Sequence, residues 1–311
     1  MSKTAFLFPG QGSQYPGMGK ELSANFSVVR QAFEEADDAL GSHLSKLCFE
    51  GPETELLLTE NTQPALLATS IAFLRLLRSE TGMEPAYIAG HSLGEYSALV
   101  AAGALDFGDA LRTVRSRGKF MQEAVPVGTG AMAAVLGVEA DVVTEICSEA
   151  AQGEIVVPAN FNCPGQIVIS GHAPAVNRAI EIAKAKGIRK VLLLPVSVPS
   201  HCALMSSAGE RLSAALEAVS VQDLNIPVVS NVEAKPFREA ERVRGLLVAQ
   251  ISSPVLWEMS VRGMIESGVT RFIELGPGKV LSGLVKKIDK TVQTKNFDDP
   301  AGFRAIEEET A

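Results

Sequence analysis

Residues 87–100 read YIAGHSLGEYSALV, and the rest of the chain is organised around this stretch. A short apolar run meets the motif G-x-S-x-G and continues with the spacing of a buried helix. Gly90 and Gly94 permit a tight strand-to-helix turn, which would hold Ser92 exposed and in a strained backbone conformation. The helix would direct backbone N–H groups toward whatever Ser92 attacks. We interpret the stretch as a nucleophile elbow; the alternative is a glycine-rich turn that merely contains a serine.

Length and composition describe an ordinary globular protein. The chain has 311 residues, 46% hydrophobic and 21% charged, enough for one large domain with an insertion or for two domains. No apolar run has membrane-spanning length, and residues 1–8 lack the pattern of a signal peptide, so we expect a cytoplasmic protein. The net charge of −8 argues against nucleic acid as the main partner. Four scattered cysteines, without a C-x-x-C pair or a histidine cluster, indicate neither a disulfide framework nor a metal site.

The first part of the chain alternates apolar runs with helical patterns. Residues 4–8 predict a central strand, and residues 9–14, PGQGSQ, predict a glycine-rich turn at its carboxyl end. This turn lacks the spacing of a nucleotide-binding loop. It could direct backbone N–H groups into a crevice or simply connect two elements, and spacing alone favours neither. Amphipathic helical patterns cover 20–59, and a further helix is expected from Pro64 to about Arg78.

A helix predicted over 109–122 contains one charge in an unusual place. At about 100° per residue, Arg117 falls at the margin of the apolar face, while the other basic side chains lie opposite. No acidic residue stands one helical turn away to pair with it. Arg117 therefore either pairs with a distant carboxylate or binds an anionic ligand. The pattern by itself slightly favours the structural role, because arginines at such margins commonly extend outward to water.

The organisation changes between residues 127 and 198. Strands are expected at 131–138, 155–162, 166–170 and 190–198, and helices at 140–151 and 173–186. This β-α-β-β-α-β order is that of a ferredoxin-like unit. We therefore expect an α/β fold: a hydrolase-like parallel-sheet core made of residues 1–126 and 199–311, with a ferredoxin-like α+β subdomain inserted at 127–198.

A histidine suited to act as general base follows this subdomain. His201 comes after a long apolar run, at an exit marked by Pro199, where a hydrolase-type chain order places its histidine. A serine hydroxyl needs a base that can later return the proton to the leaving group, and imidazole can do both. His91 is next to Ser92 in sequence, but side chains diverge on a sharp elbow, so we expect His91 to support the turn.

The C-terminal third returns to the main α/β pattern. The expected elements are helices at 203–219, 240–250 and 254–265, strands at 226–231 and 271–275, and a last helix ending at 288. Residues after 290 show little periodicity. Asp223 and Glu274 are candidates for the third member of a triad, but neither is persuasively placed. Gln250 could instead orient the histidine through a carbonyl oxygen.

Several separated motifs carry a resemblance that covers essentially the whole chain. They are FPGQGSQ at 8–14, residues 90–105, Arg117, residues 160–165, VPSH at 198–201 and FIELGPG at 272–278. In this order they resemble the acyltransferase family of bacterial malonyl-CoA:acyl carrier protein transacylases. The resemblance is more specific than the elbow alone, because it rests on several motifs in the same order.

The resemblance implies a role for each residue of the reaction centre. Ser92 would be the nucleophile, His201 the general base and acid, and Gln250 the group that orients His201. The backbone N–H groups of Gln11 and Leu93 would form the oxyanion hole.

The resemblance also implies how substrate is held. Arg117 would bind the malonyl carboxylate, which reverses the slight preference drawn from the helical pattern. Asn160 and Asn162 would line the substrate site together with Gln11. A carboxylate suits the two-pronged geometry of a guanidinium, whereas the methyl group of an acetyl substrate would leave Arg117 unpaired.

The implied activity is transfer of a malonyl group from coenzyme A to the phosphopantetheine thiol of acyl carrier protein, for fatty acid biosynthesis. It would proceed through a malonyl-serine, with ping-pong kinetics and without a metal or redox cofactor. We expect a monomer that uses no nucleic acid or membrane. One alternative is a serine thioesterase or hydrolase, which would normally bring an acidic third member. A second is a transacylase acting in trans for polyketide synthesis. A third is a non-catalytic carrier-binding module, which would not need Ser92 and His201 together.

The overall charge is in tension with an acidic carrier protein, which a chain at −8 should repel unless basic residues gather locally. Two clusters are candidates: Lys184, Lys186, Arg189 and Lys190 in the subdomain, and Lys279, Lys286 and Lys287 near the last helix. Each cluster alone could be ordinary solvated surface. We hypothesise that at least one docks the carrier.

Overall fold

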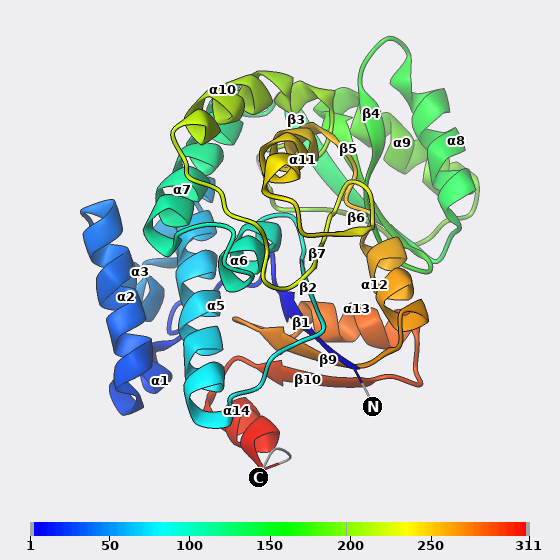
Figure 1. Ribbon diagram of the computed structural model, residues 1–311. Helices are drawn as coiled ribbons and strands as arrows, with labels where there is room; N and C mark the ends of the chain where they lie inside the picture. The colour runs from blue at the N-terminus through cyan, green and yellow to red at the C-terminus, as the bar shows by residue number, and fades with distance from the viewer. Residues whose placement is uncertain (1–2, 197, 309–311) are drawn as a thin grey trace.

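The computed structural model describes residues 3–196 and 198–308, which form two β-sheets with helices packed around them (Figure 1). In these residues the larger sheet has six strands in the order β10-β9-β1-β2-β7-β8. The strands are β1 (Lys3–Phe8), β2 (Tyr87–Gly90), β7 (Val228–Val229), β8 (Pro236–Phe237), β9 (Val269–Leu275) and β10 (Gln293–Phe297). Neighbouring strands are parallel except for β7 and β8. The predicted parallel-sheet core is confirmed.

Helices cover both faces of this sheet. They are α1 (Lys20–Asn25), α2 (Ser27–Leu40), α3 (Leu44–Glu50), α4 (Glu53–Leu56), α5 (Thr59–Thr81), α6 (Gly94–Ala101), α7 (Phe107–Glu123), α10 (Ser206–Glu217), α11 (Ala240–Ser252), α12 (Trp257–Glu266), α13 (Val280–Ile288) and α14 (Pro300–Glu307), with a 3-10 turn at Ala203–Met205. Within the described residues, no helix combines the length and apolar character needed to cross a membrane.

Side-chain alternation along β1 explains why this strand lies inside the sheet. Phe6 and Phe8 enter a core shared with α2, α5, α6 and α7 on one face. Ala5 and Leu7 enter a second core, shared with α12 and α13, on the other face. All four side chains are fully buried. Because both faces are covered, the strand can be apolar throughout. The glycine-rich turn follows its carboxyl end, at the edge of the sheet where ligands of parallel sheets bind.

The smaller sheet is antiparallel, with the order β4-β5-β3-β6. It consists of β3 (Gly130–Leu136), β4 (Val156–Cys163), β5 (Gln166–His172) and β6 (Val191–Leu193), covered on one face by α8 (Ala140–Ala151) and α9 (Ala173–Ala185). Figure 1 shows this unit in green at one end of the molecule. The strand order is ferredoxin-like, as predicted. Boundaries at 126/127 and 198/199 remain our proposal for the division into domains.

Strand β4 connects the smaller sheet to the core. The Phe161 N–H donates to the Val255 carbonyl at 2.9 Å, and the Val255 N–H donates to the Ala159 carbonyl at 2.9 Å. These two bonds hold β4 against the segment between α11 and α12. The side chains that alternate along β4 are thereby fixed beside the core rather than on a free edge.

The strand predicted at 190–198 is much shorter in the structure. β6 spans only Val191–Leu193, and Leu192 and Leu193 are 56% and 58% exposed. Pro195 lacks the N–H that would continue pairing with β3. Ser197, which the same prediction included, lies outside the described residues.

Three other boundaries differ from the prediction. Residues after 290 contain β10 and α14. Their weak periodicity did not reveal these elements, because β10 lies at the edge of the larger sheet in the described residues and most of its side chains are only partly buried. The strand expected at 226–231 is reduced to Val228–Val229. The helix expected to start at Pro64 begins at Thr59, so the buried Pro64 lies just beyond the first turn and removes one backbone hydrogen bond.

Candidate active site

The elbow has the predicted strand, turn and helix. Ser92 lies between β2 and α6 with a φ of 49°, a left-handed conformation that is strained for a serine. A Cβ added to Gly90 would lie 1.9 Å from the carbonyl carbon of Gly94, and one added to Gly94 would lie 2.1 Å from the carbonyl oxygen of Phe8. Both positions therefore require glycine, because the turn folds back on itself and packs against the end of β1.

Asn231 holds the elbow from the side, a role that sequence reasoning missed. Its Oδ1 accepts the Ser92 N–H at 2.7 Å, and its Nδ2 donates to the Gly90 carbonyl at 2.6 Å. One side chain thus bonds the backbone on both sides of His91. The available signal was weak: an asparagine at the end of the predicted strand 226–231.

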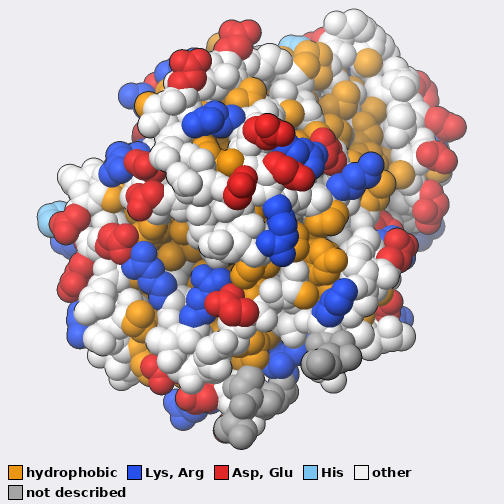
Figure 2. All heavy atoms as spheres, in the orientation of Figure 1, with side chains coloured by type: hydrophobic (Ala, Val, Ile, Leu, Met, Phe, Trp, Pro, Cys, Tyr) orange, Lys and Arg blue, Asp and Glu red, His pale blue; other side chains and the backbone are white. Residues whose placement is uncertain are grey.

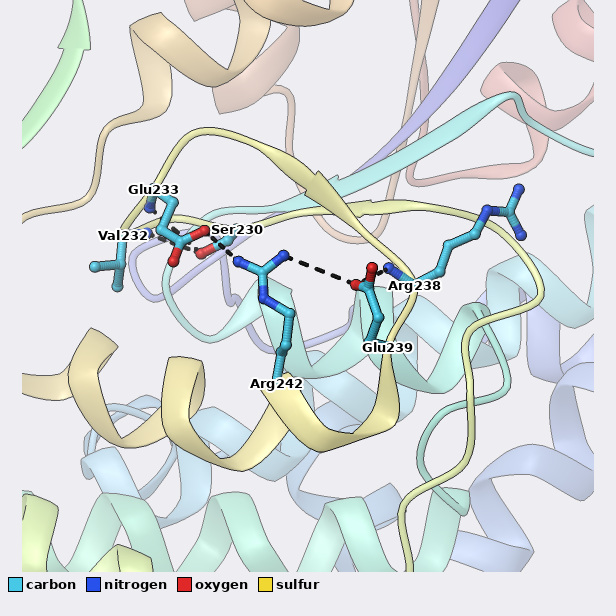
Figure 3. Close-up of polar contacts among 6 residues, drawn as sticks. All are labelled: Ser230, Val232, Glu233, Arg238, Glu239 and Arg242. Atoms are coloured by element: carbon cyan, nitrogen blue, oxygen red, sulfur yellow. Dashed lines mark hydrogen bonds and ion pairs between the residues drawn. The ribbon is translucent and has the colours of Figure 1, made fainter.

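The loop that carries Asn231 is tied to α11 at the surface. Figure 3 shows the Ser230 hydroxyl accepting the N–H groups of Val232 and Glu233, and the Arg242 guanidinium bound to Glu233. These contacts shape the turn that returns the chain from β7 to β8.

His201 lies beside Ser92. Its Nε2 is 2.8 Å from the Ser92 Oγ, and its Nδ1 is 2.8 Å from the main-chain carbonyl oxygen of Gln250. A carbonyl oxygen only accepts hydrogen bonds, so Nδ1 carries the proton and Nε2 is free to accept the serine proton. Like Ser92, His201 has a positive φ, 62°. Burial, reinforced by the positive charge of Arg117, lowers the pKa of His201 to about 3, so the imidazole is neutral at pH 7.

Neither acidic candidate orients the histidine. Glu274 accepts the N–H groups of Leu281 and Ser282 at the start of α13, and Asp223 accepts the N–H of Ala240 at the start of α11. Both carboxylates therefore cap helices, a use for which the amino ends of helices are well suited. The backbone carbonyl of Gln250 makes the contact to His201 that the alternative from the sequence describes, and its role in orienting the histidine stays a prediction.

Arg117 points into the site, not outward to water. Its side chain is fully buried. Nη1 donates to Gln63 Oε1 at 2.9 Å, and Nη2 donates to Gln250 Oε1 at 2.9 Å and lies 3.3 Å from Ser92 Oγ. The outward orientation favoured by the helical pattern is wrong, because two glutamine side chains distant in sequence replace the water that the guanidinium would otherwise seek.

A buried carboxylate, Glu95, completes this group and was not predicted. It is 1% exposed, and its Oε2 accepts from Gln250 Nε2 at 2.6 Å and from the Asn231 N–H at 3.4 Å. Burial raises the pKa of Glu95 to about 7 against the lowering effects of Gln250, Asn231 and the Arg117 charge. The signal in the sequence was a single acid in the otherwise apolar elbow helix.

The two predicted oxyanion donors lie on segments in contact with each other. The His91 N–H donates to the Phe8 carbonyl at 3.0 Å, and a Cβ on Gly10 would lie 2.4 Å from the His91 carbonyl oxygen. The turn after β1 is therefore pressed against the elbow. In the described part of the chain, neither the Gln11 N–H nor the Leu93 N–H donates to another group. Their role in an oxyanion hole stays a prediction.

The two asparagines of β4 differ in what they contact. Asn162 Oδ1 lies 2.9 Å from His91 Nε2, and the His91 ring packs on Trp257 with centroids 5.5 Å apart. His91 thus supports the turn, as expected, and Asn162 supports His91. Asn160 is buried, and its backbone pairs with Val255. Their contact with substrate stays a prediction.

Comparison with known proteins agrees with this geometry. The acyl transferase domain family matches residues 5–299. The chain is 52% identical over 301 residues to a malonyl CoA-acyl carrier protein transacylase of Bacillus subtilis, covering 96% of this chain and 95% of that protein. It is 49% identical over 305 residues to the Escherichia coli K12 protein of the same name, covering 98% of this chain and 99% of that protein.

Solved structures match over the same extent. The malonyl-CoA:acyl carrier protein transacylase of Xanthomonas oryzae aligns with a TM-score of 0.97 at 49% identity, covering 99% of this chain and 98% of that one. A malonyl-transacylase solved in complex with its type II polyketide acyl carrier protein also aligns with a TM-score of 0.97, at 48% identity, covering 99% of this chain and all of the other. The chain belongs to the acyl transferase family, and within it to the malonyl-CoA:acyl carrier protein transacylases.

Proposed function

We propose that the chain moves a malonyl group from coenzyme A to the phosphopantetheine thiol of acyl carrier protein by way of an ester on Ser92. The observation that carries this proposal is the position of the Ser92 hydroxyl, 2.8 Å from a neutral imidazole and 3.3 Å from a buried guanidinium. The Ser92 Oγ, as nucleophile, thus lies within hydrogen-bond distance of a base, His201, and of a cation that can bind a carboxylate, Arg117. Such a site can both react with a malonyl thioester and recognise it.

In the first half-reaction, His201 Nε2 takes the Ser92 proton as Oγ attacks the thioester carbon. The N–H groups of Gln11 and Leu93 stabilise the oxyanion that forms. The carbon–sulfur bond breaks, the coenzyme A thiolate takes the proton from His201, and a malonyl ester remains on Ser92. Every group in this step belongs to the chain or the substrate, so the route uses no further cofactor.

In the second half-reaction, the carrier thiol gives its proton to His201 and its sulfur attacks the ester carbon. The bond to Oγ breaks, and Ser92 recovers the proton from His201. Throughout, the malonyl carboxylate would lie against Arg117, with Gln11, Asn160 and Asn162 around the acyl group. A paired carboxylate is the natural ligand of a buried guanidinium.

We propose that the carrier docks on the cluster at α13. In the subdomain cluster, Lys184 pairs with Glu181 and Lys186 with Glu149, so two of its charges are already neutralised. Among the described residues, no ion pair involves Lys279, Lys286 or Lys287, which are all exposed. An acidic carrier would be attracted to the unpaired cluster.

The proposed setting is cytoplasmic fatty acid biosynthesis, with the chain acting as a monomer. A polyketide carrier is the second candidate, because one similar transacylase was solved with such a carrier. Discharge rates of the acyl-enzyme onto the two kinds of carrier distinguish the settings.

The test is the intact mass of the protein after brief incubation with malonyl-CoA, followed by acyl carrier protein. We expect a malonyl-sized adduct that is absent in Ser92→Ala and is discharged onto the carrier. An adduct lost to water at the same rate without carrier would instead indicate a hydrolase. No adduct at all would overturn the proposed activity.

A further inference from the structure

The buried site contains two opposite charges that do not touch. Arg117 and Glu95 are 0% and 1% exposed. Among the ion pairs of residues 3–196 and 198–308, none joins them. The Gln250 side chain lies between them, donating to Glu95 from Nε2 at 2.6 Å and accepting from Arg117 at Oε1 at 2.9 Å.

This arrangement fixes the orientation of the amide at both ends. A carboxylate only accepts hydrogen bonds, and a guanidinium only donates them. If the amide rotated by 180°, its oxygen would face Glu95 and its NH₂ group would face Arg117. Both contacts would be repulsive, and a third bond, from Nε2 to the Ser92 carbonyl at 2.9 Å, would also be lost.

The indirect contact leaves Arg117 ready for a ligand. A direct ion pair with Glu95 would neutralise the guanidinium and compete with an incoming carboxylate. In the structure, the guanidinium instead binds three neutral oxygens, on Gln63, Ser92 and Gln250. Burial lowers the pKa of Arg117, and the nearby charge of Glu95 is one of the influences that oppose this shift.

We propose that Glu95 is a positioning residue for acyl selectivity: it locks the Gln250 amide, which holds Arg117 beside Ser92 with its charge free for the substrate carboxylate. The inference rests on the proposed function. It predicts that the Glu95 charge matters more for a malonyl substrate than for an acetyl one, since only malonyl uses Arg117.

The experiment measures the initial rates of Ser92 acylation by malonyl-CoA and by acetyl-CoA, using intact mass, in the wild type and in Glu95→Gln, at a pH above 8, where Glu95 with its pKa of about 7 is ionised. The substitution preserves size but removes the charge and allows the facing amide to rotate. We expect the malonyl-to-acetyl rate ratio to fall about 10-fold, the scale of one hydrogen bond to a charged group.

Glu274→Gln is the matched control. Glu274 is also a fully buried carboxylate with a pKa raised by burial to about 7, but it caps α13 and does not contact Arg117, Gln250 or Ser92. We expect this variant to unfold more easily while keeping the wild-type ratio.

An equal loss of both rates in Glu95→Gln, with the ratio unchanged, would overturn the proposal and leave Glu95 a purely structural role. If Glu95→Gln does not fold, Gln250→Met removes the connecting amide while keeping the backbone carbonyl that His201 uses. An unchanged ratio in that variant would equally overturn the proposal. A wild type that forms no Ser92-dependent adduct would instead contradict the proposed function.

Discussion

Two arginine–carboxylate clusters in this protein use the same chemistry in opposite surroundings. Arg242, on the surface of α11, binds Glu233 directly and lies 3.8 Å from Glu239, and the three side chains are 35%, 40% and 58% exposed (Figure 3). Figure 2 shows acidic and basic side chains side by side in this part of the surface. In the site, Arg117 and Glu95 are buried, and the Gln250 side chain lies between them and bonds both.

The difference shows what burial does to a charge. On the surface, water already solvates both partners, so direct pairing adds only about 0–1 kcal/mol. In the interior, protein groups must replace the water around the charge. An arginine held only by neutral oxygens remains without a counter-ion, so binding an anion there is favourable. Arg242 is thus paired with carboxylates of this chain, whereas Arg117 is held by neutral oxygens and is the arginine to which our proposal assigns the substrate carboxylate.

Asn231 links the two regions, and removing it is expected to have a larger effect than lowering the pH or removing the surface pairs. Asn231→Ala deletes the acceptor of the Ser92 N–H and the donor to the Gly90 carbonyl. We expect the acylation rate to fall about 10- to 100-fold and the free energy of unfolding to fall by about 1–3 kcal/mol. Initial-rate kinetics and urea unfolding measure the two effects.

Asn61→Ala is the control, because the Asn61 amide bonds a surface carbonyl, that of Glu55. A wild-type acylation rate in Asn231→Ala would show that the glycines alone hold the elbow.

The pH profile of acylation tests the electrostatics of the buried site, where His201 lies next to Arg117. Burial and the Arg117 charge lower the pKa of His201 to about 3, so the base stays neutral well below pH 6. In Glu95→Gln, where His201 is the one of the groups His201 and Glu95 left to titrate, we expect kcat/KM for malonyl-CoA, which reports the free enzyme, to change less than about 3-fold from pH 7 to pH 5. A histidine with an ordinary pKa would lose about 25-fold over this range.

Glu95 titrates near neutrality, with a pKa raised by burial to about 7, so the wild type is expected to show a further loss with a midpoint near pH 7 that is absent in Glu95→Gln. Circular dichroism verifies the fold at each pH. A steep loss below pH 6.5 in both proteins would contradict the electrostatic account of His201.

The smallest effect on activity and stability is expected for the exposed cluster of Arg242, Glu233 and Glu239. Arg242→Ala breaks the surface pairs with Glu233 and Glu239, but water replaces them. We expect kcat/KM within about 2-fold of the wild type and a loss of under about 1 kcal/mol in the free energy of unfolding, shrinking further at high salt. A loss as large as that of Asn231→Ala would mean that the surface pairs hold the elbow loop.

The features predicted well from sequence are those that neighbouring residues determine. The elbow depends on Gly90 and Gly94, which lie two residues from Ser92 on either side, and the ferredoxin-like order follows from local periodicity. His201 was chosen from its position in the chain order, and the structure places it beside Ser92.

The features that were missed depend on contacts between distant segments. Glu95 meets a partner 155 residues away, and Asn231 meets Ser92 across 139 residues. The periodicity around Arg117 located its helix face correctly, but it could not show that Gln63 and Gln250 close over the guanidinium. The short β6 was missed because an apolar composition does not distinguish a paired strand from an exposed segment.

The central claim is that Arg117 selects a carboxylated acyl group, and the most direct test compares acylation of Ser92 in the wild type and in Arg117→Ala. Malonyl-CoA and acetyl-CoA are offered at equal concentration, and the two adducts are separated by intact mass. We expect the wild type to carry malonyl almost entirely, and the variant to lose malonyl about 100-fold or more, the scale of a broken buried charge pair, while gaining acetyl in relative terms. A variant that still prefers malonyl would contradict the account.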